Sequence, residues 1–232
     1  MKVIMQWKYK ASRKPSAVFT SDWLDAGSAL IIAEDLEKSG RLKDVEFKDD
    51  FETTWTKKEL KKLLTVVEEE PQDVTVFFDG GYQKEQNIAG LGVVIYYRQG
   101  KKSFRIRANL RLDQFESNNE AEYAALYEAL NQMEELGVHH QSCFFKGDSL
   151  VVLNQLSGDW PCMEENLNKW LDRIEAKMEK MKIIPHYQPI SRKENQEADR
   201  LATQALQGEA IFSKLEIADQ RSRNKDESEK NL

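Results

Sequence analysis

The chain has 232 residues, a net charge of -6 and 40% hydrophobic residues, enough apolar material for one large domain or two small ones. No apolar run approaches the ~18 residues of a membrane helix, and the N-terminal MKVIMQWKYKAS lacks the continuous apolar stretch of a secretion signal. The acidic balance also argues against a simple cationic nucleic-acid binder, in which Lys and Arg contacts to phosphate dominate the affinity.

The two cysteines indicate a reducing compartment. Cys143 lies in an apolar segment and Cys162 in a polar one, with neither metal-ligand spacing nor a disulfide framework. We therefore predict a cytoplasmic protein that is not attached to a membrane.

Residues 1–70 are predicted to form a small α+β domain of unknown role. Strands are expected at residues 3–10 and 17–23, followed by an amphipathic helix at residues 26–39 that Gly40 ends. Residues 45–47 and 53–55 flank turn residues and indicate a short hairpin. The segment TKKELKKLLTVVEE is predicted to be a helix that Thr56 and Glu59 begin as a capping box. The run EEEP at residues 68–71 breaks this pattern and marks a domain boundary.

The first strand and the turn after it combine aromatic and cationic side chains, and two interpretations stay open. These side chains could stack on and neutralise a nucleic acid, or the aromatic rings could belong to the core while the cations are solvated. We favour the second interpretation. The residues concerned are Trp7, Lys8, Tyr9, Lys10, Arg13 and Lys14.

Residues 71–210 are predicted to form an α/β domain. Strands are expected at residues 74–78, 90–98, 103–110, 142–146 and 183–189, and the continuous apolar run of the first suits a central position. Helices are expected at residues 118–136, 163–181 and 194–206, with another that begins at Asp148. This order predicts a mixed five-stranded sheet with helices on both faces. Residues 211–232 are polar and charged, and we predict a disordered tail.

Four acidic residues stand at the ends or beginnings of these elements: Asp79 in VTVFFDGG, Glu122 in SNNEAEY, Asp148 in FFKGDS and Asp199 in ENQEADRLA. Simple structural explanations exist for two of them. Asp79 could belong to a turn with Gly80 and Gly81, and Asp148 could be a helix N-cap.

Glu122 and Asp199 are harder to explain structurally. On a helix, Glu122 shares the apolar stripe that includes Leu126 and Leu130, and Asp199 lies at the margin of another apolar face. A buried carboxylate without a partner is unfavourable by several kcal/mol, so a metal ion or another cation is expected nearby. Four carboxylates from separate segments are the oxygen donors that two Mg²⁺ or Mn²⁺ ions use to activate water in phosphodiester hydrolysis.

The ordered set of motifs resembles ribonuclease H type 1. It consists of VTVFFDGG, AGLGVVIYY, SNNEAEYAALYEAL, GDSLVVLNQLSGDW and ENQEADRLATQAL, and it spans residues 74–206. The resemblance is closer to the short bacterial and archaeal "reverse transcriptase-like" branch, here with an extra N-terminal domain. The loop SRKEN contains no histidine, where many family members have an auxiliary one.

The resemblance implies an endoribonuclease that cleaves the RNA strand of RNA–DNA hybrids and leaves 5′-phosphate and 3′-hydroxyl ends. Asp79, Glu122, Asp148 and Asp199 would then be both the catalytic residues and the ligands of two Mg²⁺ or Mn²⁺ ions, with Asp79 and Asp148 at strand ends. The alternative is a weak or inactive module that keeps the fold and binds nucleic acid or protein. The sequence names no protein partner.

Five further residues are candidates for contacts to the hybrid. The two glycines would let the backbone approach the nucleic acid, and the polar run before Glu122 offers groups that sense the RNA 2′-hydroxyl, although helix capping also explains that run. The candidates are Gly80, Gly81, Ser117, Asn118 and Asn119.

Overall fold

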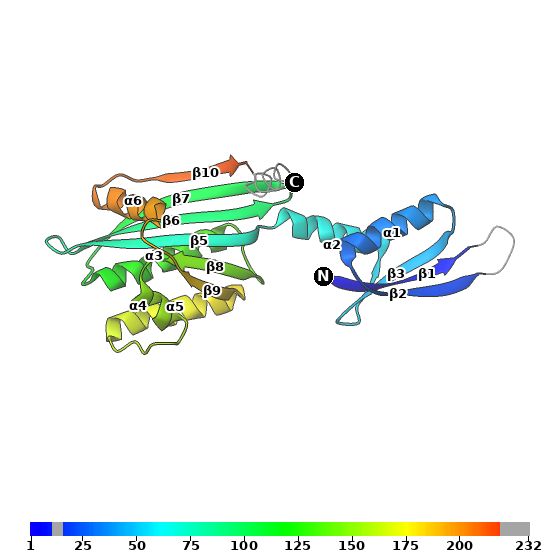
Figure 1. Cartoon of the computed structure of the whole chain (residues 1–232), viewed down its shortest axis with the longest axis horizontal. Helices are drawn as coiled ribbons and strands as arrows, with labels where there is room; N and C mark the ends of the chain where they lie inside the picture. The colour runs from blue at the N-terminus through cyan, green and yellow to red at the C-terminus, as the bar shows by residue number, and fades with distance from the viewer. Residues whose placement is uncertain (11–15, 219–232) are drawn as a thin grey trace, which may run out of the picture. The chain divides into compact units, whose positions relative to one another are not determined.

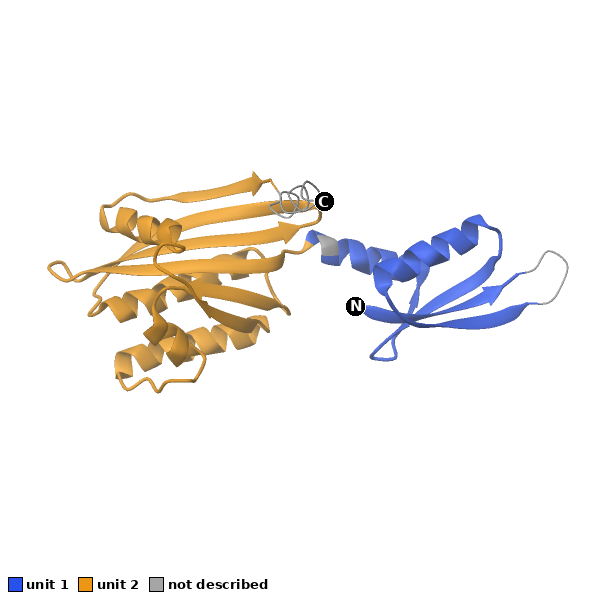
Figure 2. Cartoon of the chain, viewed as in Figure 1, with its two compact units in different colours: residues 1–69 blue, residues 70–232 orange. Residues whose placement is uncertain are grey.

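The computed structural model describes residues 1–10 and 16–218. The chain divides into two compact units, Met1–Glu69 and Glu70–Leu232 (Figure 2). Arg13 and Lys14, and residues 219–232 of the predicted tail, lie outside the described residues. Among the helices of the described part, none is both long enough and apolar enough to cross a membrane.

The first unit is a four-stranded antiparallel sheet with two helices (Figure 1). Its strands β1 (Lys2–Tyr9), β2 (Ala17–Asp25), β3 (Leu42–Asp49) and β4 (Thr54–Thr56) lie in the order β2-β1-β3-β4, and its helices are α1 (Ala26–Lys38) and α2 (Lys57–Glu69). Val3, Met5, Phe47 and Leu60 are fully buried between them. Trp7 packs against this core, as its core interpretation predicts.

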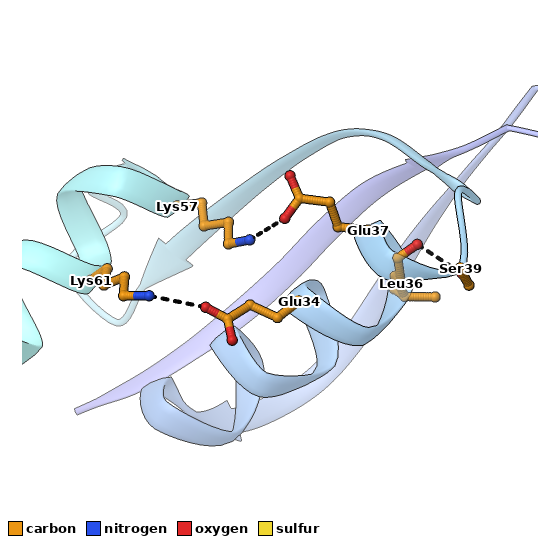
Figure 3. Close-up of polar contacts among 6 residues, drawn as sticks. All are labelled: Glu34, Leu36, Glu37, Ser39, Lys57 and Lys61. Carbon is orange, nitrogen blue, oxygen red and sulfur yellow. Dashed lines mark hydrogen bonds and ion pairs between the residues drawn. The ribbon is translucent and has the colours of Figure 1, made fainter.

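Polar contacts fix how α2 begins and how it lies against α1. Thr56 and Glu59 form the predicted capping box, since the N–H of Glu59 donates to Thr56 Oγ1 at 3.2 Å and the N–H of Thr56 donates to Glu59 Oε2 at 2.9 Å. Figure 3 shows Lys57 paired with Glu37 and Lys61 paired with Glu34, both between the two helices. Exposed ion pairs of this kind contribute little, so burial of the apolar side chains supplies most of the stability.

The second unit contains a mixed sheet of six strands, one more than predicted. The strands are β5 (Gln72–Gln83), β6 (Ile88–Gln99), β7 (Lys102–Asp113), β8 (Ser142–Gly147), β9 (Ile184–Pro189) and β10 (Phe212–Ile217), in the order β10-β7-β6-β5-β8-β9. β8 runs parallel to β5 and β9, and the other pairs are antiparallel. Four helices accompany the sheet: α3 (Asn118–Glu135), α4 (Leu150–Leu156), α5 (Glu165–Met181) and α6 (Gln196–Leu206).

The additional strand, β10, corrects the prediction that disorder begins at residue 211. It pairs with β7 at the edge of the sheet, and Asn109 of β7 holds the chain just before it. The Asn109 side chain donates to the carbonyl oxygens of Leu201 at 3.1 Å and Glu209 at 2.8 Å, and it accepts from the N–H of Ile211 at 2.7 Å. Phe212 is 68% exposed, so the strand forms through these backbone partners rather than through burial of an apolar face.

Two glycines let helices approach opposite faces of the sheet. A Cβ on Gly80 would lie 2.2 Å from the backbone of Ala121 in α3, and a Cβ on Gly92 would lie 2.1 Å from the Ala198 carbonyl oxygen in α6. Gly92 is paired with Asp79, the neighbour of Gly80, so the two glycines face opposite sides of the sheet. Helices therefore cover both faces, as predicted, and α3 and α6 reach the same stretch of β5 from either side.

Candidate metal centre

Three carboxylates converge in the second unit. Asp79 of β5, Glu122 of α3 and Asp148, which follows β8, each offer an oxygen atom, and these oxygens lie within 4.8 Å of one another. Asp79 and Glu122 are buried and Asp148 is half-buried. Three separate elements thus bring together a set of oxygen donors that suits a hard divalent cation.

The local structure excludes the turn and cap explanations for two of these residues. Asp79 and Gly80 lie within β5, which continues to Gln83, so Asp79 is neither in a turn nor at a strand end. Helix α4 is capped by Ser149, which accepts a hydrogen bond from the N–H of Val152 at 3.5 Å. Asp148 therefore has no capping role in this helix, and the alternative explanation as an N-cap does not hold.

Glu122 occupies a position that is unfavourable unless a cation is bound. Its side chain is 5% exposed on the buried face of α3, as the helical stripe predicts, and its Oε2 has no hydrogen-bond partner among the described residues. The close approach of α3 to Gly80 brings the carboxylate against Asp79 and Asp148. An unpartnered buried oxygen facing two other acids is well explained by a metal ligand.

The pKa values of the cluster are raised first by burial and then by repulsion between its charges. Burial, together with the charges of Asp148 and Asp199, raises the pKa of Asp79 to about 7. Burial and the charges of Asp79 and Asp148 likewise raise the pKa of Glu122 well above its usual range. Neighbouring Arg192 opposes the shift of Asp79 without cancelling it. The folded chain therefore keeps acids together whose negative charges repel one another.

Asn195, which is not among the predicted site residues, fixes the position of Asp148. Its side chain is 1% exposed and donates from Nδ2 to Asp148 Oδ1 at 2.8 Å and to the carbonyl oxygen of Phe78 at 2.9 Å. Asn195 therefore ties the loop before α6 to β5 and to the carboxylate after β8. Its place four residues before Asp199 in ENQEADRLA, one helical turn, is a signal that could have found it.

Replacing Asn195 with Ala is expected to displace Asp148 and to weaken divalent-metal binding about 10- to 100-fold, as loss of a residue that orients a metal ligand typically does. Stability should fall by about 1–3 kcal/mol because the buried Phe78 carbonyl loses its donor. Calorimetric titration with Mn²⁺ measures the first effect, and thermal unfolding measures the second.

Asn109→Ala is the matched control for this prediction, because Asn109 also holds backbone groups through its side-chain amide but does not contact the cluster. It should lose comparable stability and keep the Mn²⁺ affinity of the wild type. Equal loss of Mn²⁺ affinity in the two variants would contradict a positioning role for Asn195.

Asp199 is close to the cluster but is not among the three converging carboxylates. Its Oδ1 accepts a hydrogen bond from Arg192 Nη2 at 3.1 Å, and its charge contributes to the raised pKa values of Asp79 and Glu122. Arg192 lies in the loop SRKEN, which stood out in the sequence only because it contains no histidine. A cation from the chain itself thus partners the fourth predicted ligand.

The five candidates for nucleic-acid contacts lie in β5 directly after Asp79 and at the start of α3. Gly80 is buried, and the approach of α3 already explains its lack of a side chain. Ser117 caps α3 by accepting from the N–H of Glu120 at 3.1 Å, so the capping interpretation of this serine is confirmed. Gly81 and Asn119 are half-buried, and Asn118 is exposed. A contact to nucleic acid stays a prediction for all five.

Comparison with known proteins assigns the second unit to a family. Residues 77–205 match the family described as "Reverse transcriptase-like", which is more than half of the chain. The chain belongs to this ribonuclease HI-like family. It is a family of nuclease-type enzymes, and the acidic cluster of this member is of the kind that such enzymes use.

The relatives extend the match along the chain and to solved structures. The uncharacterized protein YpeP of Bacillus subtilis is 48% identical over 199 residues, which are 86% of this chain and 88% of the relative. RNase H1 of Halobacterium salinarum is 25% identical with a TM-score of 0.50, over 59% of this chain and 98% of its own. The N-terminal RNase H domain of Rv2228c from Mycobacterium tuberculosis is 26% identical with a TM-score of 0.52, over 60% of this chain and 96% of its own.

Proposed function

We propose that this protein is a two-metal-ion endoribonuclease that cleaves the RNA strand of RNA–DNA hybrids and leaves 5′-phosphate and 3′-hydroxyl ends. The observation that carries the proposal is the convergence of Asp79, Glu122 and Asp148, with oxygen atoms within 4.8 Å of one another and an unpartnered buried Oε2 on Glu122. The ribonuclease H names of the solved relatives support the reaction class. We propose residues 70–217 as the catalytic domain.

The donor set fits Mg²⁺ or Mn²⁺, because it consists of carboxylate oxygens and contains neither sulfur nor imidazole. Asp79, Glu122 and Asp148 would hold the ions, and Asp199 would join them when it leaves Arg192. Bound ions would supply the positive charge that promotes deprotonation of a water molecule and stabilises the leaving oxygen of the phosphodiester.

The residues of the chain prepare the site for this chemistry. Asn195 holds Asp148 in place, and the packing of α3 on Gly80 holds Glu122 beside Asp79. Arg192 keeps a positive charge next to Asp199, where it offsets part of the repulsion among the acids. Because Asp79 sits inside a central strand, its position does not depend on a loop.

We propose an RNA–DNA hybrid as the substrate. A solved relative, LC11-RNase H1, shares the fold at 24% identity, and its structure was determined in complex with an RNA/DNA hybrid. In the present chain, Ser117, Asn118 and Asn119 precede Glu122 by three to five residues and would lie close to a nucleic-acid strand that enters the site. We propose the cytoplasm as the compartment, which agrees with free thiols at both Cys143 and Cys162.

The test is an assay with a hybrid whose RNA strand carries a 5′ label, in Mg²⁺ or Mn²⁺. We expect cleavage of the RNA strand, and no cleavage of the same RNA in duplex with RNA. A ligase should join the products without prior phosphorylation, because the proposed cleavage leaves 5′-phosphate and 3′-hydroxyl ends. EDTA should stop the reaction. Binding of the hybrid without cleavage in either metal would instead favour a module that keeps the fold without turnover.

A further inference from the structure

One face of the second sheet carries a row of aromatic and cationic side chains that the metal centre does not use. α6 packs on one half of this face through Ala198 and Ala202, which approach Gly90 and Gly92. On the opposite face, α3, α4 and α5 enclose the main core. Side chains that alternate with that core along β5 and β8 therefore point to this face, where Phe77 packs against the cluster that α6 forms with Val94, and Phe144 is exposed.

The rings of this row belong to four neighbouring strands. Tyr96 of β6 lies opposite Thr75 of β5, which lies beside Phe144 of β8, which in turn lies beside His186 of β9. Phe77 contacts Tyr96 edge to face with ring centroids 5.8 Å apart, and Phe144 stacks on His186 at 5.2 Å. We call Phe77, Tyr96, Phe144, His186 and Lys146 the aromatic platform.

The platform is accessible and hollowed. Phe144 is 47% exposed, His186 is exposed, and Phe77, Tyr96 and Lys146 are half-buried. A cavity of about 450 Å³ is lined by Thr75, Phe77, Tyr96 and Lys146 together with Arg98. A second cavity of about 360 Å³ shares Thr75 and extends to Phe144. Planar groups therefore have room beside the rings.

A cation lies among the rings, on one of the two strands that lead to the metal centre. Lys146 Nζ is 5.4 Å from the centre of the Phe77 ring. Lys146 precedes Asp148 by two residues, and Phe77 precedes Asp79 by two residues on the same face of β5. The platform is thus continuous with the carboxylate cluster along two strands.

We propose that the aromatic platform binds single-stranded nucleic acid, with bases stacked on the rings and phosphate near Lys146. Rings with an interspersed cation suit this ligand, because every base offers a π-face and the backbone is anionic. A protein partner fits less well, since charged side chains are depleted in the buried core of protein interfaces. The proposal is separate from hydrolysis, because no platform residue is among the carboxylates.

The test measures binding of a fluorescein-labelled 20-nucleotide oligothymidylate to the full chain by fluorescence anisotropy, in EDTA so that no cleavage occurs. Phe144→Ala combined with His186→Ala should raise the Kd at least tenfold, because each lost base–aromatic stack weakens binding by roughly 5- to 150-fold. Lys146→Ala should raise the Kd and reduce the salt dependence of binding by about one phosphate contact. Thermal unfolding checks that each variant is folded.

Phe212→Ala is the matched control, because Phe212 is an aromatic residue that is 68% exposed and lies away from the platform. Phe212 pairs with Ala108, whose neighbour Arg107 points to the platform face, so Phe212 points to the opposite face of the sheet. It should bind like the wild type. Failure of the wild type to cleave hybrids would refute the proposed nuclease and leave this binding intact.

A direct measurement complements the variants. The same oligonucleotide carrying 5-iodouracil should cross-link on irradiation to peptides that contain platform residues, identified by mass spectrometry. Cross-links confined to residues 1–69, an unchanged Kd in the double variant, or an equal loss with Phe212→Ala would each overturn the proposal. So would a wild-type dimer, seen by light scattering, that Phe144→Ala dissociates, since a second copy would then cover the face.

Discussion

Replacing Asp148 with Asn is expected to reduce hydrolysis of the RNA strand by roughly 10³-fold or more, because losing even one preorganised electrostatic group at a reacting centre commonly costs about 10²–10³. The substitution keeps the shape of the side chain and removes the charge that would bind the metal ions. The amide can still accept the hydrogen bond from Asn195, so the local fold should persist. Initial rates on a labelled hybrid in Mg²⁺ and in Mn²⁺ measure the effect.

Asp172→Asn is the matched control, since Asp172 is exposed on α5 and is not one of the converging carboxylates. It should cleave at the rate of the wild type, while both variants show wild-type circular dichroism. The assignment of the metal centre would be abandoned if purified, folded Asp148→Asn cleaved the hybrid at the wild-type rate.

The sequence alone was sufficient for the features that depend on local periodicity. The apolar stripe of the helix that starts after Ser117 predicted a buried carboxylate at Glu122, and this residue is 5% exposed. The capping box at Thr56 and Glu59 is likewise a contact between residues three positions apart. Such patterns can be predicted because the period of a helix determines which residues along the chain share a face.

Features that depend on contacts between segments far apart in the sequence could not be predicted from the sequence. The glycines after Asp79 suggested a turn, whereas they lie within β5 because α3 and α6 need small residues on the strands they approach. The sixth strand was missed because its side chains remain largely exposed and its partners are backbone groups of β7. The pairing of Arg192 with Asp199 likewise depends on the conformation of the loop before α6.

A second large effect is expected in the stability of the metal-free protein as the pH rises. The pKa of Asp79 is about 7 in the folded chain, against an ordinary value of 3.8. Between about pH 4 and pH 7 the folded state therefore binds more protons than the unfolded state, so the free energy of unfolding falls as the pH rises. This rise in the pKa of Asp79 corresponds to a loss of at most about 4 kcal/mol in the free energy of unfolding across that pH range. Glu122 acts in the same direction.

The variant Asp79→Asn isolates this contribution, because the amide cannot ionise beside Asp148, Asp199 and Glu122, with Arg192 as the nearby cation. In EDTA, we expect the wild type to unfold at a lower temperature at pH 8 than at pH 5, and the variant to lose much of that difference. Saturating Mg²⁺ or Mn²⁺ at pH 8 should restore the wild type, by about 2.7 kcal/mol at 100 times the Kd, and should have little effect on the variant.

Calorimetry at pH 5, 6, 7 and 8 checks this prediction, with Asp172→Asn as the variant that should follow the wild type. The comparison of variants in one buffer removes the pH dependence of all other groups, including those of the first unit. Parallel pH profiles for wild type and Asp79→Asn in EDTA would mean that the Asp79 carboxyl is neither desolvated nor held against like charges in the folded chain. The physical reason for a metal ion at this site would then be lost, since the repulsion among these acids is what a bound cation relieves.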